Sequence, residues 1–188
     1  LLRLAALLHG LGVPGGGAAA DRDEGSRGKE RGAALMIRLR FSNAEIREVT
    51  ELLGVGPEPP RQLSAPPDLR RWLHHVGPHL LPSLARIWLA KARLDRARWG
   101  SGPEAALALI SRLRRELREG APLALEDLAV DGRDLIALGL RPGPRFGEIL
   151  QGLMEWVLED PARNRREVLL EVRRAVRRAA PRFLPNML

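Results

Sequence analysis

Cysteine is absent from this chain of 188 residues, and lysine is nearly absent, with two residues against 29 arginines. Without cysteine the chain can form no disulfide, thiolate zinc site or iron–sulfur cluster, and it has no cysteine nucleophile. This composition suits a reducing compartment, so we expect a cytoplasmic protein. Long apolar runs are also missing, because none approaches the roughly 20 residues that span a bilayer. We therefore expect no membrane association.

Residues that favour β-strands are scarce as well. Val, Ile and Thr together number 16, against 35 Leu, and no segment alternates apolar and polar residues over the length of a strand. Leu and Ala lose little on entering a helix, whereas strands favour branched and aromatic side chains. The composition predicts an all-α fold. Since the sequence does not begin with Met, we also expect it to be part of a longer chain.

Apolar residues recur at intervals of three and four in several segments, which predicts amphipathic helices. Three successive glycines and few apolar residues predict a mobile loop over Gly15–Arg27. The sequence Gly120-Ala121-Pro122 predicts a boundary between a helical bundle at 1–120 and a smaller helical tail at 121–188. The expected helices cover 1–9, 29–40, 43–53, 68–76, 79–99, 104–119, 132–138, 145–159 and 163–180.

The net charge of +8 is concentrated in two segments. Residues 86–118 hold nine basic and three acidic residues, and residues 161–188 hold eight arginines and two glutamates, so each segment is +6. The arginine guanidinium matches phosphate oxygens two at a time, so this surplus favours a polyanionic partner. Most runs of this kind, however, are solvated outer faces of helices.

Glycine, proline and arginine alternate between residues 139 and 147 in a pattern that suits phosphate binding. Gly139 can end one short helix in the left-handed conformation, and Pro144 can begin the next helix. Arg141 and Arg145 flank the N–H groups of that helix start, while Gly143 and Gly147 carry no Cβ that would hinder an approaching backbone. A tight corner whose glycines serve only packing explains the same residues equally well.

Other candidate sites have weaker patterns. His75 and His79 have the spacing of a metal-binding pair, but Gly77-Pro78 breaks the helix that would place both on one face. Asp21-Arg22-Asp23 has the spacing of a two-metal nucleotidyl-transfer site, yet no strand precedes it to hold the carboxylates. We therefore expect neither a metal site nor a catalytic residue in this chain.

Four segments form one colinear series: Leu4–Pro14, Gly28–Leu53, Leu69–Leu94 and Pro122–Leu170. The most specific stretch runs from Asp127 through Gly139, Gly143 and Gly147, and then continues through Val157–Pro161 to Asn164. The series resembles the helical C-terminal part of bacterial tRNA nucleotidyltransferases. These belong to the CCA-adding and poly(A) polymerase superfamily, in its branch that carries an HD domain.

The resemblance implies an all-α body and tail that hold the acceptor arm and elbow of tRNA during 3′-end processing. The catalytic head, with Mg²⁺ and CTP or ATP, would be supplied in cis or in trans, so this chain alone lacks the catalytic carboxylates of the transferase and needs no cofactor. We expect recognition of RNA backbone and shape. The expected RNA-binding residues are Arg112, Arg115, Arg133, Arg141, Gly143, Arg145, Gly147, Arg166, Arg173 and Arg174.

The HD portion departs from the family pattern at its metal ligands. The His-Asp pair is His9-Gly10 here, the later Gly-His-Glu is Gly28-Lys29-Glu30, and an Ala-Asp is Ala90-Lys91. Glycine provides no ligand and lysine repels a cation. We therefore expect a degenerate HD module that serves as a scaffold, with Lys29 and Lys91 facing RNA phosphate.

Three other functions stay open on the sequence. An HD-type metal-dependent phosphohydrolase would need at least three metal ligands near His9. A non-catalytic helical interaction module would form a homodimer through exposed leucines and Trp72, Trp88 and Trp156. A helix-hairpin-helix binder of duplex DNA would share the geometry of the 139–147 turn.

Overall fold

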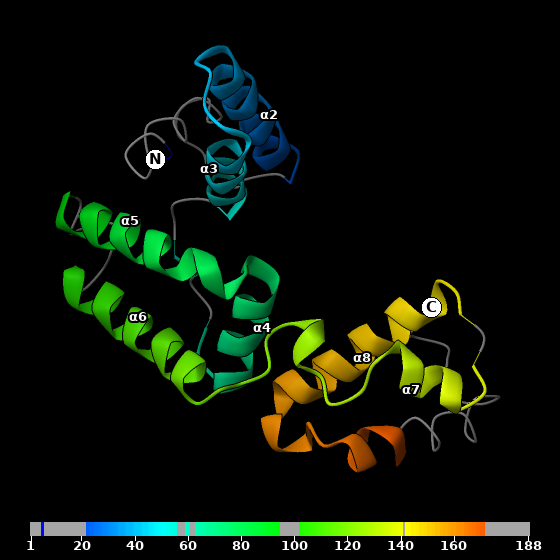
Figure 1. Ribbon diagram of the computed structural model, residues 1–188. Coiled ribbons are helices and arrows are strands. Elements are labelled where there is room, and N and C mark those ends of the chain that lie inside the picture. Colours follow the sequence, from blue (N-terminus) through cyan, green and yellow to red (C-terminus); the bar gives the residue numbers. More distant parts are fainter. Residues whose placement is uncertain are drawn as a thin grey trace. The chain divides into compact units, whose positions relative to one another are not determined.

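The computed structural model describes residues 5, 22–55, 59–60, 63–94, 102–140 and 142–171, with the side chains of 22–28 excepted (Figure 1). Within these ranges every regular element is a helix and no strand occurs, which confirms the predicted all-α fold. None of the described helices is long and apolar enough to cross a membrane. The α-helices are α2 (Arg22–Arg38), α3 (Asn43–Val55), α4 (Pro66–Val76), α5 (Leu81–Leu94), α6 (Pro103–Arg118), α7 (Gly132–Ala137) and α8 (Arg145–Glu159).

Three short 3-10 helices, η2 (Pro78–Leu80), η3 (Leu125–Asp127) and η4 (Pro161–Arg163), connect these elements, and residues 166–171 are helical. The last predicted helix therefore begins later than residue 163. Pro161 opens η4, and Asp160 Oδ1 accepts a bond of 3.0 Å from the Ala162 N–H, so this turn ends before the helix starts.

The beginning of α2 differs from the sequence prediction. A mobile loop was expected over Gly15–Arg27, and this expectation is wrong for residues 22–27, which are helical. Each residue added to a helix contributes one backbone hydrogen bond, so the helix that follows extends back through these residues despite the low helix propensity of glycine. The rest of that predicted loop lies outside the described residues, as do the predicted helix at 1–9 apart from Ala5 and the predicted helical residues 95–99 and 172–180.

The chain folds into two compact units. The N-terminal unit contains residues 1–62 and 76–114, and the C-terminal unit contains residues 63–75 and 115–188. Nearly all of α4 therefore folds with the C-terminal helices. The division at residue 120 into an HD-like module and an RNA-binding tail concerns function and stays a prediction.

In the N-terminal unit, α2 and α3 pack closely against each other. Met36 and Val49 are fully buried between them, and a Cβ added to Gly32 would lie 2.5 Å from Leu53 Cδ1, so only glycine fits this crossing without repacking.

The start of α3 is fixed by Ser42 and Glu45. Glu45 Oε2 accepts from the Ser42 N–H at 2.8 Å, which lowers the pKa of Glu45.

Three helices end in the same hydrogen-bonded motif, with a left-handed residue two positions past the last helical residue. Gly139 (φ 80°) ends α7 in this way, as the sequence predicted, through bonds from Gly139 N to Ile136 O and from Leu140 N to Leu135 O. Gly120 (φ 69°) ends α6 with the same pattern. At the end of α2, however, the left-handed position is occupied by Arg40 (φ 58°).

Replacing Arg40 by glycine should stabilise the N-terminal unit. A side chain in the left-handed region costs about 1 kcal/mol, and part of this gain is offset by the greater freedom of glycine in the unfolded chain. We expect Arg40→Gly to raise the free energy of unfolding by about 0.5 kcal/mol, measured by urea denaturation. The control Arg38→Gly, inside the helix, should lower it by about 1 kcal/mol. A loss of stability in Arg40→Gly would contradict this account.

Candidate nucleic-acid interface

The start of α7 is held by two aspartates. Asp131 Oδ1 accepts from the N–H groups of Arg133 at 2.7 Å and of Asp134 at 3.2 Å, and Asp134 Oδ2 accepts from Asp131 N–H at 3.1 Å. This reciprocal capping box satisfies the first N–H groups of the helix. Since Gly139 fixes the other end, the six residues of α7 have defined limits.

The first residues of α7 and α8 lie beside each other. A Cβ built on Gly132 would lie 3.6 Å from Phe146 Cδ2, which is ordinary van der Waals contact. Arg133 follows Gly132 in α7, Arg145 precedes Phe146 in α8, and both arginines are exposed. We call residues 132–147 the α7–α8 corner.

The two predicted glycines of this corner face open space. A Cβ added at Gly143 or at Gly147 would meet nothing within 4 Å, so neither glycine is needed for packing against the described chain. The carbonyl of Gly143 accepts the Phe146 N–H at 2.9 Å and thereby closes the first turn of α8. A helix start with exposed backbone and neighbouring arginines suits an anionic ligand.

The structure thus brings together four of the predicted RNA-binding residues, Arg133, Gly143, Arg145 and Gly147. Arg115 is exposed on α6, and no described residue forms an ion pair with Arg115, Arg133 or Arg145. Arg112, one turn earlier on α6, is half-buried. The predicted residues Arg141, Arg173 and Arg174 lie outside the described residues.

Arg166 has an internal partner. Its guanidinium forms an ion pair with Asp134 Oδ1 through Nη2, and its Nε lies 3.1 Å from the same oxygen. Hydrogen bonding to Arg166 lowers the pKa of Asp134, and the same contact raises the pKa of Arg166. Arg166 therefore ties the 166–171 helix to the start of α7, and its charge is largely balanced by Asp134.

Asn164 makes a second tie in the same region. Its Nδ2 donates to Asp127 O at 2.8 Å, and its Oδ1 accepts from Ala129 N–H at 2.8 Å. Because one amide satisfies both a carbonyl and an N–H group of the 127–129 turn, this turn is held against the segment that follows α8. The resemblance included Asn164, but no local sequence pattern predicts this contact.

Arg70 is the main polar residue in the interior of the C-terminal unit, and sequence reasoning missed it. It is 7% exposed, and its three nitrogens reach three acceptors: Nε donates to Leu158 O at 2.6 Å, Nη1 to Glu116 Oε2 at 2.8 Å and Nη2 to Glu159 O at 2.8 Å. Glu116 is 4% exposed. The guanidinium thus joins α4 to the end of α6 and to the last carbonyls of α8.

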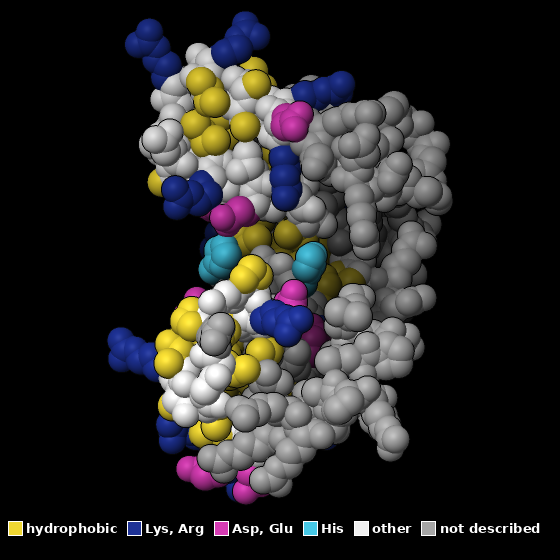
Figure 2. All heavy atoms as spheres, turned by 90° about the vertical axis from the view of Figure 1, so that its right-hand side faces the viewer, with side chains coloured by type: hydrophobic (Ala, Val, Ile, Leu, Met, Phe, Trp, Pro, Cys, Tyr) yellow, Lys and Arg dark blue, Asp and Glu magenta, His cyan; other side chains and the backbone are white. Residues whose placement is uncertain are grey.

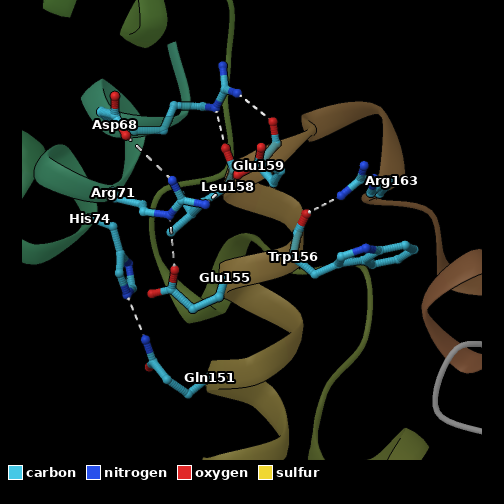
Figure 3. A network of polar contacts seen from close by, with 10 residues as sticks. Asp68, Arg71, His74, Gln151, Glu155, Trp156, Leu158, Glu159 and Arg163 are labelled. Carbon is cyan, nitrogen blue, oxygen red and sulfur yellow. Dashed lines mark hydrogen bonds and ion pairs between the residues drawn. The ribbon is translucent and has the colours of Figure 1, made fainter. Parts of the chain in front are cut away.

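The next residues of α4 extend this link on the outside, as Figure 3 shows. Arg71 forms ion pairs with Glu159 and, at 3.4 Å, with Glu155 of α8, and the bond to Glu159 raises the pKa of Arg71. One turn later His74 Nδ1 lies 2.8 Å from Leu123 O, and its Nε2 lies 3.1 Å from Gln151 Nε2. We call the contacts of Arg70, Arg71 and His74 the α4–α8 clamp.

The described histidines His74 and His79 each have a separate partner. His74 belongs to the clamp, and His79 Nε2 lies 3.0 Å from Glu51 Oε2. Among the described residues there is no group of three or more His, Asp or Glu side chains that could hold a metal ion. His9 and Asp21 lie outside the described side chains.

Trp88, one of the tryptophans expected at a dimer surface, is fully buried, and that expectation is wrong for Trp88 because it forms part of the α5 core.

The basic side chains are spread over the visible surface. On the face shown in Figure 2, Lys and Arg side chains lie at separate points with uncharged or acidic side chains between them. Lys29 is exposed, and its methylene chain lies over Gly54 of α3, whereas Lys91 is half-buried on α5. On the face shown, charge alone does not mark an interface, and the α7–α8 corner is distinguished by its open backbone.

Comparisons with known proteins find similarity to tRNA nucleotidyltransferases. Residues 111–172, which include the α7–α8 corner and the α8 side of the clamp, match the family described as tRNA nucleotidyltransferase domain 2. The A-adding tRNA nucleotidyltransferase of Deinococcus radiodurans is 33% identical over 166 residues, which cover 82% of this chain. This chain therefore contains a region related to the tRNA nucleotidyltransferases. It spans 37% of the length of this relative, and no solved structure matches it.

The α4–α8 clamp can be tested by removing one charge at a time. Glu116→Leu leaves the Arg70 guanidinium buried without its carboxylate, so we expect the free energy of unfolding to fall by about 3–5 kcal/mol. The double variant Arg70→Met/Glu116→Leu should lose less than the sum of the two single changes. The control Arg71→Met breaks only partly exposed ion pairs and should cost about 1 kcal/mol or less. If urea unfolding shows Glu116→Leu to be no more destabilising than Arg71→Met, the buried Arg70–Glu116 pair is not the central contact of the clamp.

Proposed function

We propose that this chain binds tRNA as the body and tail of a tRNA nucleotidyltransferase. The observation that carries this proposal is the position of the α7–α8 corner, with exposed Arg133 and Arg145 beside open glycine backbone, inside the segment that matches the family. The similarity to the A-adding enzyme of Deinococcus radiodurans favours the addition of A over the addition of complete CCA. Binding of tRNA and a cytoplasmic location belong to this proposal.

The corner would bind the phosphate backbone of the RNA. The N-terminus of α8 provides a partial positive charge, and the two arginines add full charges on either side of it. Because Gly143 and Gly147 have no neighbours within 4 Å of an added Cβ, a sugar-phosphate chain could approach the helix start closely. Contacts of this kind recognise the shape and backbone of RNA and carry little base specificity.

Catalysis would belong to a head outside the given sequence, and that head would bind Mg²⁺ and CTP or ATP. This chain would position the tRNA so that its 3′ end reaches the head. The N-terminal unit would serve as a degenerate HD module, with Lys29 and Lys91 facing RNA. Neutral or cationic residues at three expected ligand positions, Gly10, Lys29 and Lys91, support a scaffold role over metal-dependent hydrolysis.

Neutralising the corner should weaken tRNA binding. We expect Arg133→Gln/Arg145→Gln to bind a tRNA transcript at least tenfold more weakly at low salt, measured by fluorescence anisotropy. The slope of log affinity against log salt should also become shallower by about two, because two phosphate contacts are lost.

The matched control is Arg47→Gln/Arg86→Gln, which removes the same charge from two exposed arginines of the N-terminal unit. It should change the slope by less than the corner variant does. Equal effects of the two double variants would show that only net charge matters. An affinity of the unmodified chain that is weak and independent of salt would contradict the proposed function itself.

A further inference from the structure

Trp156 and Arg163 form a cation–π stack on the surface of the C-terminal unit. The guanidinium carbon of Arg163, in η4, lies over the indole of Trp156, in α8, at 4.9 Å from the ring centroid. Both residues are half-buried, and 32% of the Arg163 side chain is exposed. Figure 3 shows the indole projecting away from the axis of α8 with Arg163 next to it. Neither the family resemblance nor the phosphate-binding corner uses this pair.

The position of Arg163 is fixed by further contacts. Its Nη1 donates to Trp156 O at 3.2 Å, and its Nε forms an ion pair of 3.4 Å with Asp160 Oδ2. Asp160 Oδ1 accepts from the N–H of Ala162. Asn164, the residue after Arg163, is tied by its side-chain amide to the 127–129 turn. The guanidinium therefore does not need to be ordered when a ligand binds, which lowers the entropic cost of binding.

These contacts also select the kind of ligand. All N–H groups of a guanidinium lie in its plane, so the bonds to Trp156 O and Asp160 engage its edge. An edge occupied in this way is a poor bidentate clamp for phosphate, and Asp160 balances the charge. The groups that no described residue engages are the Nη2 edge and the flat face turned away from the indole. Flat π-systems, nucleobases above all, stack on guanidinium and aromatic planes of this kind.

We infer that the Trp156–Arg163 stack is a binding site for an unpaired nucleobase of RNA, which adds a third layer to the stack. This inference rests on the proposed function, because it takes RNA to be the partner. The α7–α8 corner would bind backbone phosphate, and the stack would distinguish an exposed base from a base paired within a helix.

The test compares two probes that have the same phosphates. One is a single-stranded RNA of 12 nucleotides, and the other is the same RNA with abasic sites in place of its central nucleotides. We expect the 188-residue chain to bind the probe with bases about tenfold more tightly, as measured by fluorescence anisotropy. Arg163→Lys retains the charge and loses the flat face, so it should reduce this ratio to about twofold. Thermal unfolding verifies that the variant is folded.

Arg165→Lys is the matched control, since Arg165 is exposed and forms no stack with any described residue. It should keep the tenfold ratio. A ratio near one for the unmodified chain, or an unchanged ratio in Arg163→Lys, would overturn the stacking inference. If salt-dependent tRNA binding persists in that case, the proposed function stands. If the chain binds neither tRNA nor the oligonucleotides, the proposed function fails as well.

Discussion

The buried guanidinium of Arg70 is the contact on which the C-terminal unit depends. The last carbonyls of a helix have no partner inside that helix, and they carry its partial negative charge. Arg70 donates to two of these carbonyls in α8, at Leu158 and Glu159. Its positive charge is paired with the carboxylate of Glu116. A buried charge with one missing partner is strongly unfavourable. The bonds of Arg70 to all three acceptors therefore require one arrangement of α4, the end of α6 and the end of α8.

This constraint determines where the candidate interface lies. The clamp holds the C-terminal end of α8, and the start of the same helix carries Gly147 and Arg145 of the α7–α8 corner. A helix of 15 residues is stiff, so an anchor at one end positions the other. Arg166 and Asn164 add independent ties around α7. The corner is thereby placed by buried and bridging contacts, while its own residues are left exposed for a ligand.

The arginines therefore fall into two groups, those with internal partners and those without, and composition cannot distinguish these groups. Arg70, Arg71, Arg163 and Arg166 are engaged in internal contacts, whereas Arg133 and Arg145 have no ion-pair partner among the described residues. Counting charges in the 161–188 segment led to the expectation that Arg166 binds RNA, and that role stays a prediction. The structure shows that Asp134 is its immediate partner, so any RNA phosphate would have to compete with this carboxylate.

Helices and helix ends depend on residues close in the sequence and could be predicted. Contacts between residues far apart in the sequence could not. Apolar periodicity predicted the helices, and Gly139 was expected in the left-handed conformation that it adopts. The pairing of Arg70 with Glu116 joins residues 46 positions apart, and no local pattern marks it. The start of α2 was not predictable from its glycines, because their low helix propensity is outweighed by continuation of the helix that follows.

Hydrogen exchange with and without a tRNA transcript tests the central claim most directly. If the corner holds the RNA backbone, the amides of residues 143–149 should exchange more slowly in the complex. The amides around Glu116 and Leu158, which are already protected by the clamp, should change little. A complex in which tRNA is bound and the slowed amides lie only in the N-terminal unit would contradict the account.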